Sequence, residues 1–295
     1  MATFSSEPRL PRELECKIFE MAALARPTTI PKLMLVSSRV KYWVEPLLYR
    51  VLVISSEKSD SAHGFPVIAN SGTLHRMMAP KKRHFFRNAV KRIFVRGGVS
   101  AAEMEWILRA CTHVFDCCAL SLSGAALAPL TRLRRLTIKM LDFLECCKMD
   151  STHPILASIT HLDLRGICHF VLEDLYPCLS LVSNLTHFAI DSTSHDPAFQ
   201  TALCASTRLE CILFSSHGHL PLSRHEEMNM EDMIIYDGRF VCMARTIDFY
   251  LDWLHHTDTR RDFWAIADAF IQAKRQGKVE RSVFTLSDAE TSWLD

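Results

Sequence analysis

The sequence LRRLTI at residues 133–138 contains a spacing of apolar residues that decides the fold of the chain. The same spacing, apolar-x-x-apolar-x-apolar, returns as ITHLDL at 159–164, LTHFAI at 185–190 and LECILF at 209–214. The middle apolar residues lie 26, 26 and 24 residues apart, a period typical of proteins built from stacked strand-containing units. One such unit cannot bury its own apolar face, whereas stacked neighbours bury a continuous core. The spacing therefore predicts a repeat scaffold.

Parallel strands joined by helices or coil in one hand predict an α/β fold with a curved parallel sheet. We expect an irregular array similar to leucine-rich repeats over residues 85–216. The middle residues of the four copies should stack as one internal column, Leu136, Leu162, Phe188 and Ile212.

The array is expected to be irregular at its start. Ile93 lies in an earlier predicted strand, and Leu120 follows it by 27 residues in the next strand. Only 16 residues then separate Leu120 from Leu136, so one unit should be truncated. Helices are expected between strands over three stretches, 101–110, 170–181 and 196–205.

The sheet face opposite the helices is a candidate partner-binding surface, because concave sheet faces of stacked repeats bind proteins. Its outward residues on the four copies are Thr137, Asp163, Ala189 and Leu213. We expect a binding face that combines two of these with two neighbouring histidines, Thr137, Asp163, His161 and His187. The alternative is that all of them are ordinary solvent-facing residues.

The composition is that of a globular protein with a sizeable core, since 48% of residues are hydrophobic and 23% charged. The net charge of +1 provides no long-range field for nucleic acid or an acidic membrane. The first residues lack the pattern of a secretory signal, and no apolar run is long enough to span a membrane. Eleven cysteines without framework spacing are expected to be reduced and mostly buried, as in a cytoplasmic or nuclear protein.

Residues 8–55 are predicted to form a module of three short helices. Leu14, Ile18 and Met21 recur at helical spacing on one face of the first helix. Pro31 opens the second helix, and Pro46 is expected to kink or end the third near the residue that precedes it.

This module resembles an F-box, a motif with the pattern LPxEL, an Ile-Leu pair, VCxRW and a closing Leu-Trp. The matching sequences are LPREL, IF, VSSRV and LLY, at residues 10–14, 18–19, 36–40 and 47–49. Three positions depart from the pattern, Ser37, Val40 and Tyr49. Both the N-terminal stretch and the C-terminal segment are also similar to F-box-like proteins of mushroom-forming fungi.

The resemblance implies a non-catalytic adaptor. In F-box proteins this module binds the Skp-type adaptor of a cullin–RING ubiquitin ligase, and the C-terminal domain recruits a protein substrate, which the sequence here does not identify. The residues expected to contact the adaptor are Leu10, Pro11, Leu14, Ile18, Phe19, Leu33, Val36 and Val40. The alternative is a scaffold protein whose N-terminal helices only cap the array, since terminal repeats need such a cover.

Residues 56–84 read as a polar and basic linker, and 76–96 carry eight positive charges and no acidic residue. Nucleic-acid binding through this stretch is a third hypothesis, because Phe85 and Phe86 lie among the charges. The local footprint favours an acidic protein partner instead, and the two phenylalanines are expected to anchor a helix.

The remaining residues are predicted to close the array. Residues 217–237 read as an acidic loop, and 238–295 as a capping strand and helix, with the clearest helical pattern over 262–276. His217, His219 and His225 have the look of metal ligands but lack a complete ligand set, so no metal site is predicted.

Catalytic motifs are absent from the sequence. It contains no glycine-rich nucleotide loop, GxSxG, HExxH or CxxC. We therefore predict that the chain is not an enzyme and has no catalytic residues and no cofactor.

Overall fold

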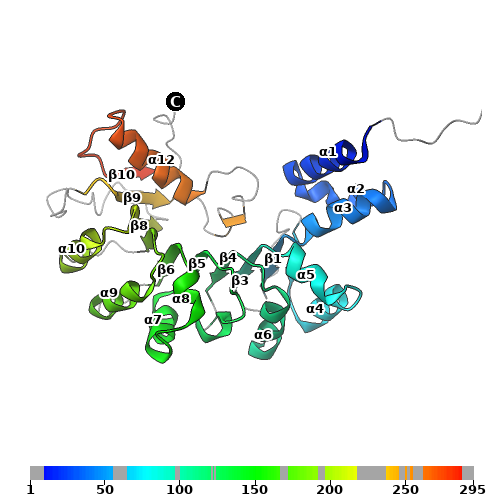
Figure 1. Cartoon of the computed structure of the whole chain (residues 1–295), viewed down its shortest axis with the longest axis horizontal. Helices are drawn as coiled ribbons and strands as arrows, with labels where there is room; N and C mark the ends of the chain where they lie inside the picture. The colour runs from blue at the N-terminus through cyan, green and yellow to red at the C-terminus, as the bar shows by residue number, and fades with distance from the viewer. Residues whose placement is uncertain are drawn as a thin grey trace, which may run out of the picture.

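The computed structural model describes residues 10–55, 65–96, 100–120, 122, 124–166, 172–191, 197–217, 237–245, 250, 253–254 and 262–287. Within these residues the chain forms eleven α-helices and one sheet of ten parallel strands (Figure 1). The sheet is open, with edge strands β2 (Val67–Ile68) and β10 (Thr285–Ser287). The predicted α/β class with a parallel sheet is confirmed.

The strands follow one another across the sheet in chain order from β3 to β10, and β1 lies between β2 and β3. From β3 to β10 each strand therefore pairs with its neighbours in sequence, so that this part of the sheet grows as a row along the chain. Between the two edges lie β1 (Val51–Ile54), β3 (Arg92–Val95), β4 (Asp116–Ala119), β5 (Arg135–Lys139), β6 (His161–Arg165), β7 (His187–Ile190), β8 (Cys211–His217) and β9 (Phe240–Arg245).

The register of the strands confirms the predicted internal column. Leu136 pairs with Leu162, which pairs with Phe188, and Phe188 pairs with Ile212. All four side chains are buried in one apolar core. This core fills the space between the sheet and the helices, so the column is part of the main core of the molecule.

The register of β4 differs from the prediction. Cys117, not Leu120, pairs with both Ile93 and Leu136, which makes the steps 24 and 19 residues. The alternation of side chains along a strand explains the difference. Cys117 and Ala119 point into the core beneath the helices, whereas Leu120 packs on the opposite face.

Seven of the described helices pack on one face of the sheet, on the outside of its curve (Figure 1). Helices are present in the described parts of the stretches predicted over 170–181 and 196–205, and the helix predicted over 101–110 has the predicted bounds. The seven are α4 (Ser71–Met78), α5 (Arg83–Ala89), α6 (Ala101–Ala110), α7 (Met140–Met149), α8 (Pro154–Ser158), α9 (Leu172–Leu181) and α10 (Pro197–Ala205).

Helix α12 (Phe263–Arg275) lies on the opposite, inner face of the sheet. Asp262 caps its first turn by accepting a hydrogen bond from the Ala265 amide at 2.6 Å. Gly277 ends it with a φ of 74°, a left-handed conformation that glycine adopts without steric cost. The helix was expected to close the open end of the array. It covers the inner face instead, and β10 forms the edge.

Three helices at the N-terminus form a small unit beyond β1 (Figure 1). They are α1 (Arg12–Ala25), α2 (Ile30–Leu33) and α3 (Ser38–Leu48), with a 3₁₀ turn over Pro27–Thr29. Pro46 does not end α3 early as expected, because it lies in the last turn and only two helical residues follow it.

Candidate docking surfaces

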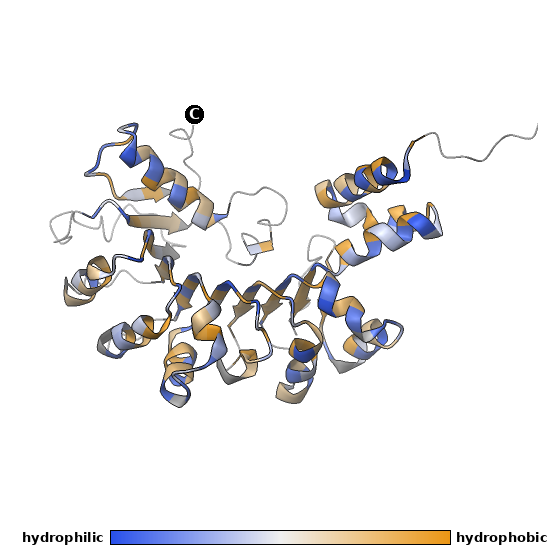
Figure 2. Cartoon of the chain, in the orientation of Figure 1, coloured by the Kyte–Doolittle hydropathy of each residue, from blue (hydrophilic) through white to orange (hydrophobic). Residues whose placement is uncertain are grey.

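Helix α1 has two apolar faces, of which one is buried and one is open. Phe19 and Ala23 face the core that α1 shares with α2 and α3. Leu14, Ile18 and Met21, at helical spacing on another face, are 54%, 53% and 59% exposed. Figure 2 shows hydrophobic residues along this helix, which projects away from the sheet. Contiguous apolar patches on folded proteins are often interaction sites, so the stripe is a candidate docking surface.

Further apolar side chains of the same unit are open to solvent. Leu10 precedes α1, and Leu35 and Val36 lie in the turn between α2 and α3; all three are exposed. A helical unit of this size has little core, since only four of its apolar residues are fully buried, Ala23, Ile30, Val40 and Val44. The unit therefore exposes more large apolar side chains than it buries.

The eight residues predicted to contact an adaptor fall into three groups. Five are exposed, Leu10, Pro11, Leu14, Ile18 and Val36. Phe19 and Leu33 are half-buried against the core of the unit, and Val40 is fully buried in it. Val40 therefore stabilises the unit and is not available to a partner. Trp43 is half-buried against the same core, and the Arg39 guanidinium lies 5.4 Å from its ring.

The unit is fixed to the sheet domain through Tyr49 and α5. The Tyr49 ring meets the rings of Phe85 and Phe86 edge-on, at 5.4 and 5.5 Å between centroids. Lys81 forms an ion pair of 2.5 Å with Glu45 of α3 beside this contact. The two phenylalanines of the basic stretch thus anchor helices, as predicted.

The predicted partner-binding face is present, but the chain itself covers its centre. His161 and His187 stack at 4.1 Å between ring centroids, and the Trp264 ring of α12 meets both edge-on. His187 Nε2 lies 3.0 Å from Asp268 Oδ1, also on α12. Desolvation, followed by the charges of His187 and Arg135, lowers the pKa of His161 to about 3.

The two other predicted residues of this face are also closed to a partner. Asp163 is 1% exposed, and its Oδ2 atom accepts hydrogen bonds from Thr137 at 3.3 Å and from Arg165 at 2.8 Å. Ala189 and Leu213, predicted to point outward, are buried beneath α12. The prediction brought the right residues to one face but was wrong about their exposure.

A second C-terminal segment covers the inner face at β1, β3 and β4. Trp253 and Leu254 are buried in a cluster with Phe94, Cys118 and other residues of these strands. The Phe94 and Trp253 rings lie 5.4 Å apart. The sequence predicted the helical pattern of α12, but no local pattern indicated where this helix or the segment with Trp253 would pack.

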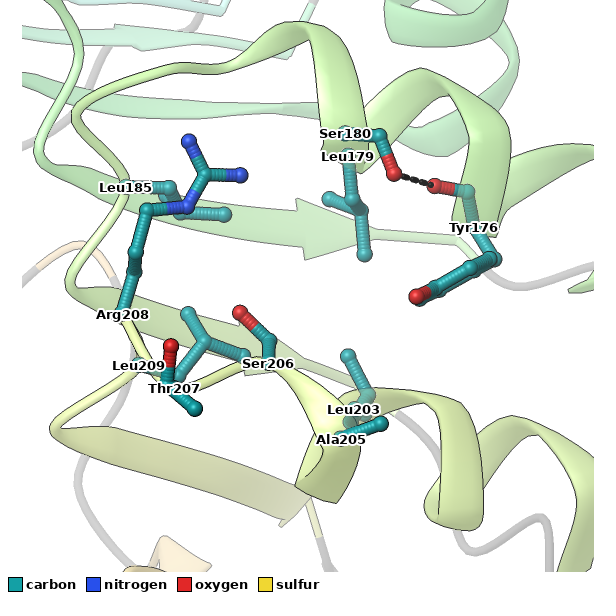
Figure 3. Close-up of a pocket in the computed structure, with 10 residues that line it drawn as sticks. All are labelled: Tyr176, Leu179, Ser180, Leu185, Leu203, Ala205, Ser206, Thr207, Arg208 and Leu209. Carbon is teal, nitrogen blue, oxygen red and sulfur yellow. Dashed lines mark hydrogen bonds between the residues drawn. The ribbon is translucent and has the colours of Figure 1, made fainter.

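A cleft of about 210 Å³ opens between α9 and α10 on the helical side of the sheet. Figure 3 shows Leu179 on one wall and Leu203 on the other. The polar groups around it are tied to the backbone: Ser180 donates to the Tyr176 carbonyl at 3.2 Å, and Arg208 donates to the Ser183 carbonyl at 2.7 Å. The cleft is therefore lined by a mixture of polar and apolar side chains, and it lies between two helices.

Other sequence predictions fall partly outside the described residues. Of the three histidines considered as metal ligands, only the backbone of His217 is described, and most of the acidic loop at 217–237 is not. Within the described ranges, every helix is too short or too polar to cross a bilayer. Comparison with protein-family models and with curated proteins gave no significant match.

Proposed function

We propose that the chain is a non-catalytic interaction adaptor in which the F-box-like unit at 8–55 binds the Skp-type adaptor of a cullin–RING ubiquitin ligase. The remainder, a degenerate leucine-rich-repeat array, then recruits the protein to be ubiquitinated. Such a ligase would operate in the cytoplasm or nucleus.

The observation that supports this proposal most directly is the open stripe of Leu14, Ile18 and Met21 on α1. Fully burying one leucine or isoleucine stabilises a complex by about 1.5–3 kcal/mol. Leu14 and Ile18 are each about half exposed. Burying the exposed halves of both would add roughly 3 kcal/mol to the binding free energy, which corresponds to about a hundredfold in Kd.

The stripe also weighs against the scaffold alternative. A unit that only caps the array would turn its apolar face toward the sheet domain and a polar face to solvent. In the structure α1 does the reverse, because its contacts are with α2 and α3 and the stripe faces away from them. The sheet domain is contacted through α3 instead.

The test is binding of a purified Skp-type adaptor to the full chain, measured by calorimetry. We expect Leu14→Asp/Ile18→Asp to weaken binding about a hundredfold or to abolish it, without loss of thermal stability, because both side chains are half exposed. Leu141→Asp is the matched control, since Leu141 is a leucine of similar exposure on α7. Unchanged binding by the folded double variant would contradict the F-box-like assignment of these helices.

A further inference from the structure

The fold separates the basic stretch at 76–96 into charges that are neutralised and charges that are not. Lys81 pairs with Glu45, and Arg92 turns to the inner face, where it pairs with Asp116 at 2.8 Å. Arg87 is exposed and Lys91 is half-buried, and neither forms an ion pair with a described carboxylate. These two charges remain available on the surface.

Residues distant in sequence extend this surface along the edge where the strands begin. The Phe115 amide donates to the Lys91 carbonyl at 3.0 Å, and the Arg134 amide donates to the Phe115 carbonyl at 2.8 Å. Lys91, Phe115 and Arg134 therefore lie in successive rows, just before β3, β4 and β5. We name as the basic edge this set with its neighbours, Arg87, Lys91, His113, Phe115, Arg132 and Arg134.

The charges of the basic edge lie close enough to act on one another. The pKa of His113 is lowered by partial desolvation and then by the positive charges of three neighbours, Arg132, Arg87 and Lys91. A bound anion would lower the repulsion between positive charges that lie this close together.

The acidic residues near the basic edge in sequence are all engaged elsewhere. Between residues 83 and 135 the chain has three of them. Glu103 caps α6 with Ser100, Glu105 pairs with Arg109, and Asp116 pairs with Arg92 beneath the inner cover. The positive charge of the edge is thus not balanced by carboxylates from its own stretch of chain.

An apolar side chain accompanies the charges. Phe115 is 40% exposed, between Lys91 and Arg134 in the rows described above. An aromatic ring among exposed cations offers one apolar contact within a surface that attracts negative charge.

We propose that the basic edge docks an acidic protein segment that places one aromatic or aliphatic side chain against Phe115. This inference deepens the proposed function and rests on it, because the segment would belong to the recruited protein. A protein segment fits better than a nucleic acid. Single strands are bound by several stacking aromatics along a basic groove, whereas Phe86 of this region is buried and Phe85 is packed against Tyr49.

The test uses the full chain and three fluorescent probes at constant salt. The first is an acidic peptide, Glu-Asp-Glu-Phe-Asp-Glu-Asp-Glu, the second replaces its phenylalanine with serine, and the third is an oligouridine of about 16 nucleotides. We expect the first peptide to bind, and Arg87→Glu/Arg132→Glu to weaken its binding about tenfold or more. Both substituted residues are exposed, so circular dichroism should show an unchanged fold.

Matched variants separate this site from general charge attraction. Arg275→Glu/Lys278→Glu reverses two exposed cations at the C-terminal end of α12 and should leave peptide binding unchanged. Phe115→Ser should remove the preference for the phenylalanine peptide over the serine peptide. Equal weakening by the Arg275/Lys278 variant, tighter binding of the RNA than of the peptide, or no peptide binding up to roughly 1 mM would overturn the proposal.

The experiments distinguish failure of one proposal from failure of the other. The Arg87/Arg132 variant should still bind the Skp-type adaptor, and the Leu14/Ile18 variant should still bind the acidic peptide. Adaptor binding without peptide binding would sink the basic-edge proposal alone, and the reverse result would sink the F-box-like assignment alone.

Discussion

Arg92 and Asp116 form a buried ion pair across neighbouring strands, with 2.8 Å between Arg92 Nε and Asp116 Oδ2. The same guanidinium donates to the Trp253 carbonyl at 2.8 Å and lies 4.0 Å from the centre of the Trp253 ring. The pair therefore joins the first part of the sheet to a segment near the C-terminus. Because water is excluded from it, each charge depends on the other.

Removing one member of this pair should destabilise the protein strongly. Arg92→Met leaves the Asp116 carboxylate buried without its partner, and we expect a loss of about 3–5 kcal/mol in the free energy of unfolding by urea. Arg92→Met/Asp116→Leu should lose less than the single variant. Lys148→Met, in an exposed pair with Asp174, is the control and should stay within about 1 kcal/mol. If the double variant lost as much stability as Arg92→Met and Asp116→Leu lose separately when added together, this account would be contradicted.

The cover of the inner face should be a major source of stability. Trp264→Ala removes the ring that packs on His161 and His187, and we expect a loss of about 3–5 kcal/mol. Trp106→Ala, at a partly exposed tryptophan on α6, should cost much less. Thermal denaturation of the two variants and the wild type would compare their stabilities. Similar losses would mean that α12 is only loosely attached to the sheet.

The internal column makes a prediction of its own. Leu162 is fully buried between Leu136 and Phe188, and Leu162→Ala should lower the free energy of unfolding by about 2–5 kcal/mol through lost contacts and a cavity. Leu141→Ala, at an exposed leucine, should change it by less than about 0.5 kcal/mol. An equally small effect at Leu162 would place it outside the core.

Buried thiols should make the protein sensitive to alkali. Burial raises the pKa of Cys111 and of Cys242 to about 12, from an ordinary value of 9.0. As pH rises above 9, the unfolded chain releases these protons first, so the unfolded state binds fewer protons and the stability falls between about pH 9 and 12.

The sign can be checked with one variant. Cys111→Ala should be less stable than the wild type at pH 7 because it leaves a small cavity. Its disadvantage should shrink above pH 9 by up to ~1.4 kcal/mol per pH unit, since the titrating thiol is gone. Urea unfolding at pH 7, 9 and 10 measures this difference, and a constant difference would exclude ionisation of Cys111 as a cause.

The elements that the sequence predicted correctly are those defined by local spacing. Leu136 and Leu162 stand in equivalent places of a repeated pattern, so their pairing could be inferred from the period alone. The place of Cys117 in the internal column was not predicted, because Leu120 is the more apolar residue nearby. Strand alternation turns Leu120 to the other face of the sheet. On α1, the spacing of Leu14 and Ile18 predicted an apolar face, and the structure was needed to show that it is open.

The cover of the inner face could not be predicted in this way. The hydrogen bond from Arg92 to Trp253 joins residues separated by 161 positions. The spacing of apolar residues on α12 indicates that one face of the helix is buried. It does not indicate which surface of the protein buries that face. His161 packs against Trp264 of α12, and Asp163 accepts hydrogen bonds from Thr137 of the neighbouring strand and from Arg165. The spacing of residues along the strand indicates none of these contacts, so the exposure of both residues was predicted wrongly.

The order in which the sheet and its cover occur along the chain has a consequence for synthesis. Strands β1 to β8 end at His217, whereas Trp253 and α12 lie later in the sequence. A growing chain on the ribosome can therefore assemble most of the sheet while Phe94 and Leu213 are still uncovered. Until α12 emerges, this apolar face is open to chaperones and to aggregation, so the synthesis of α12 is the step that protects the sheet.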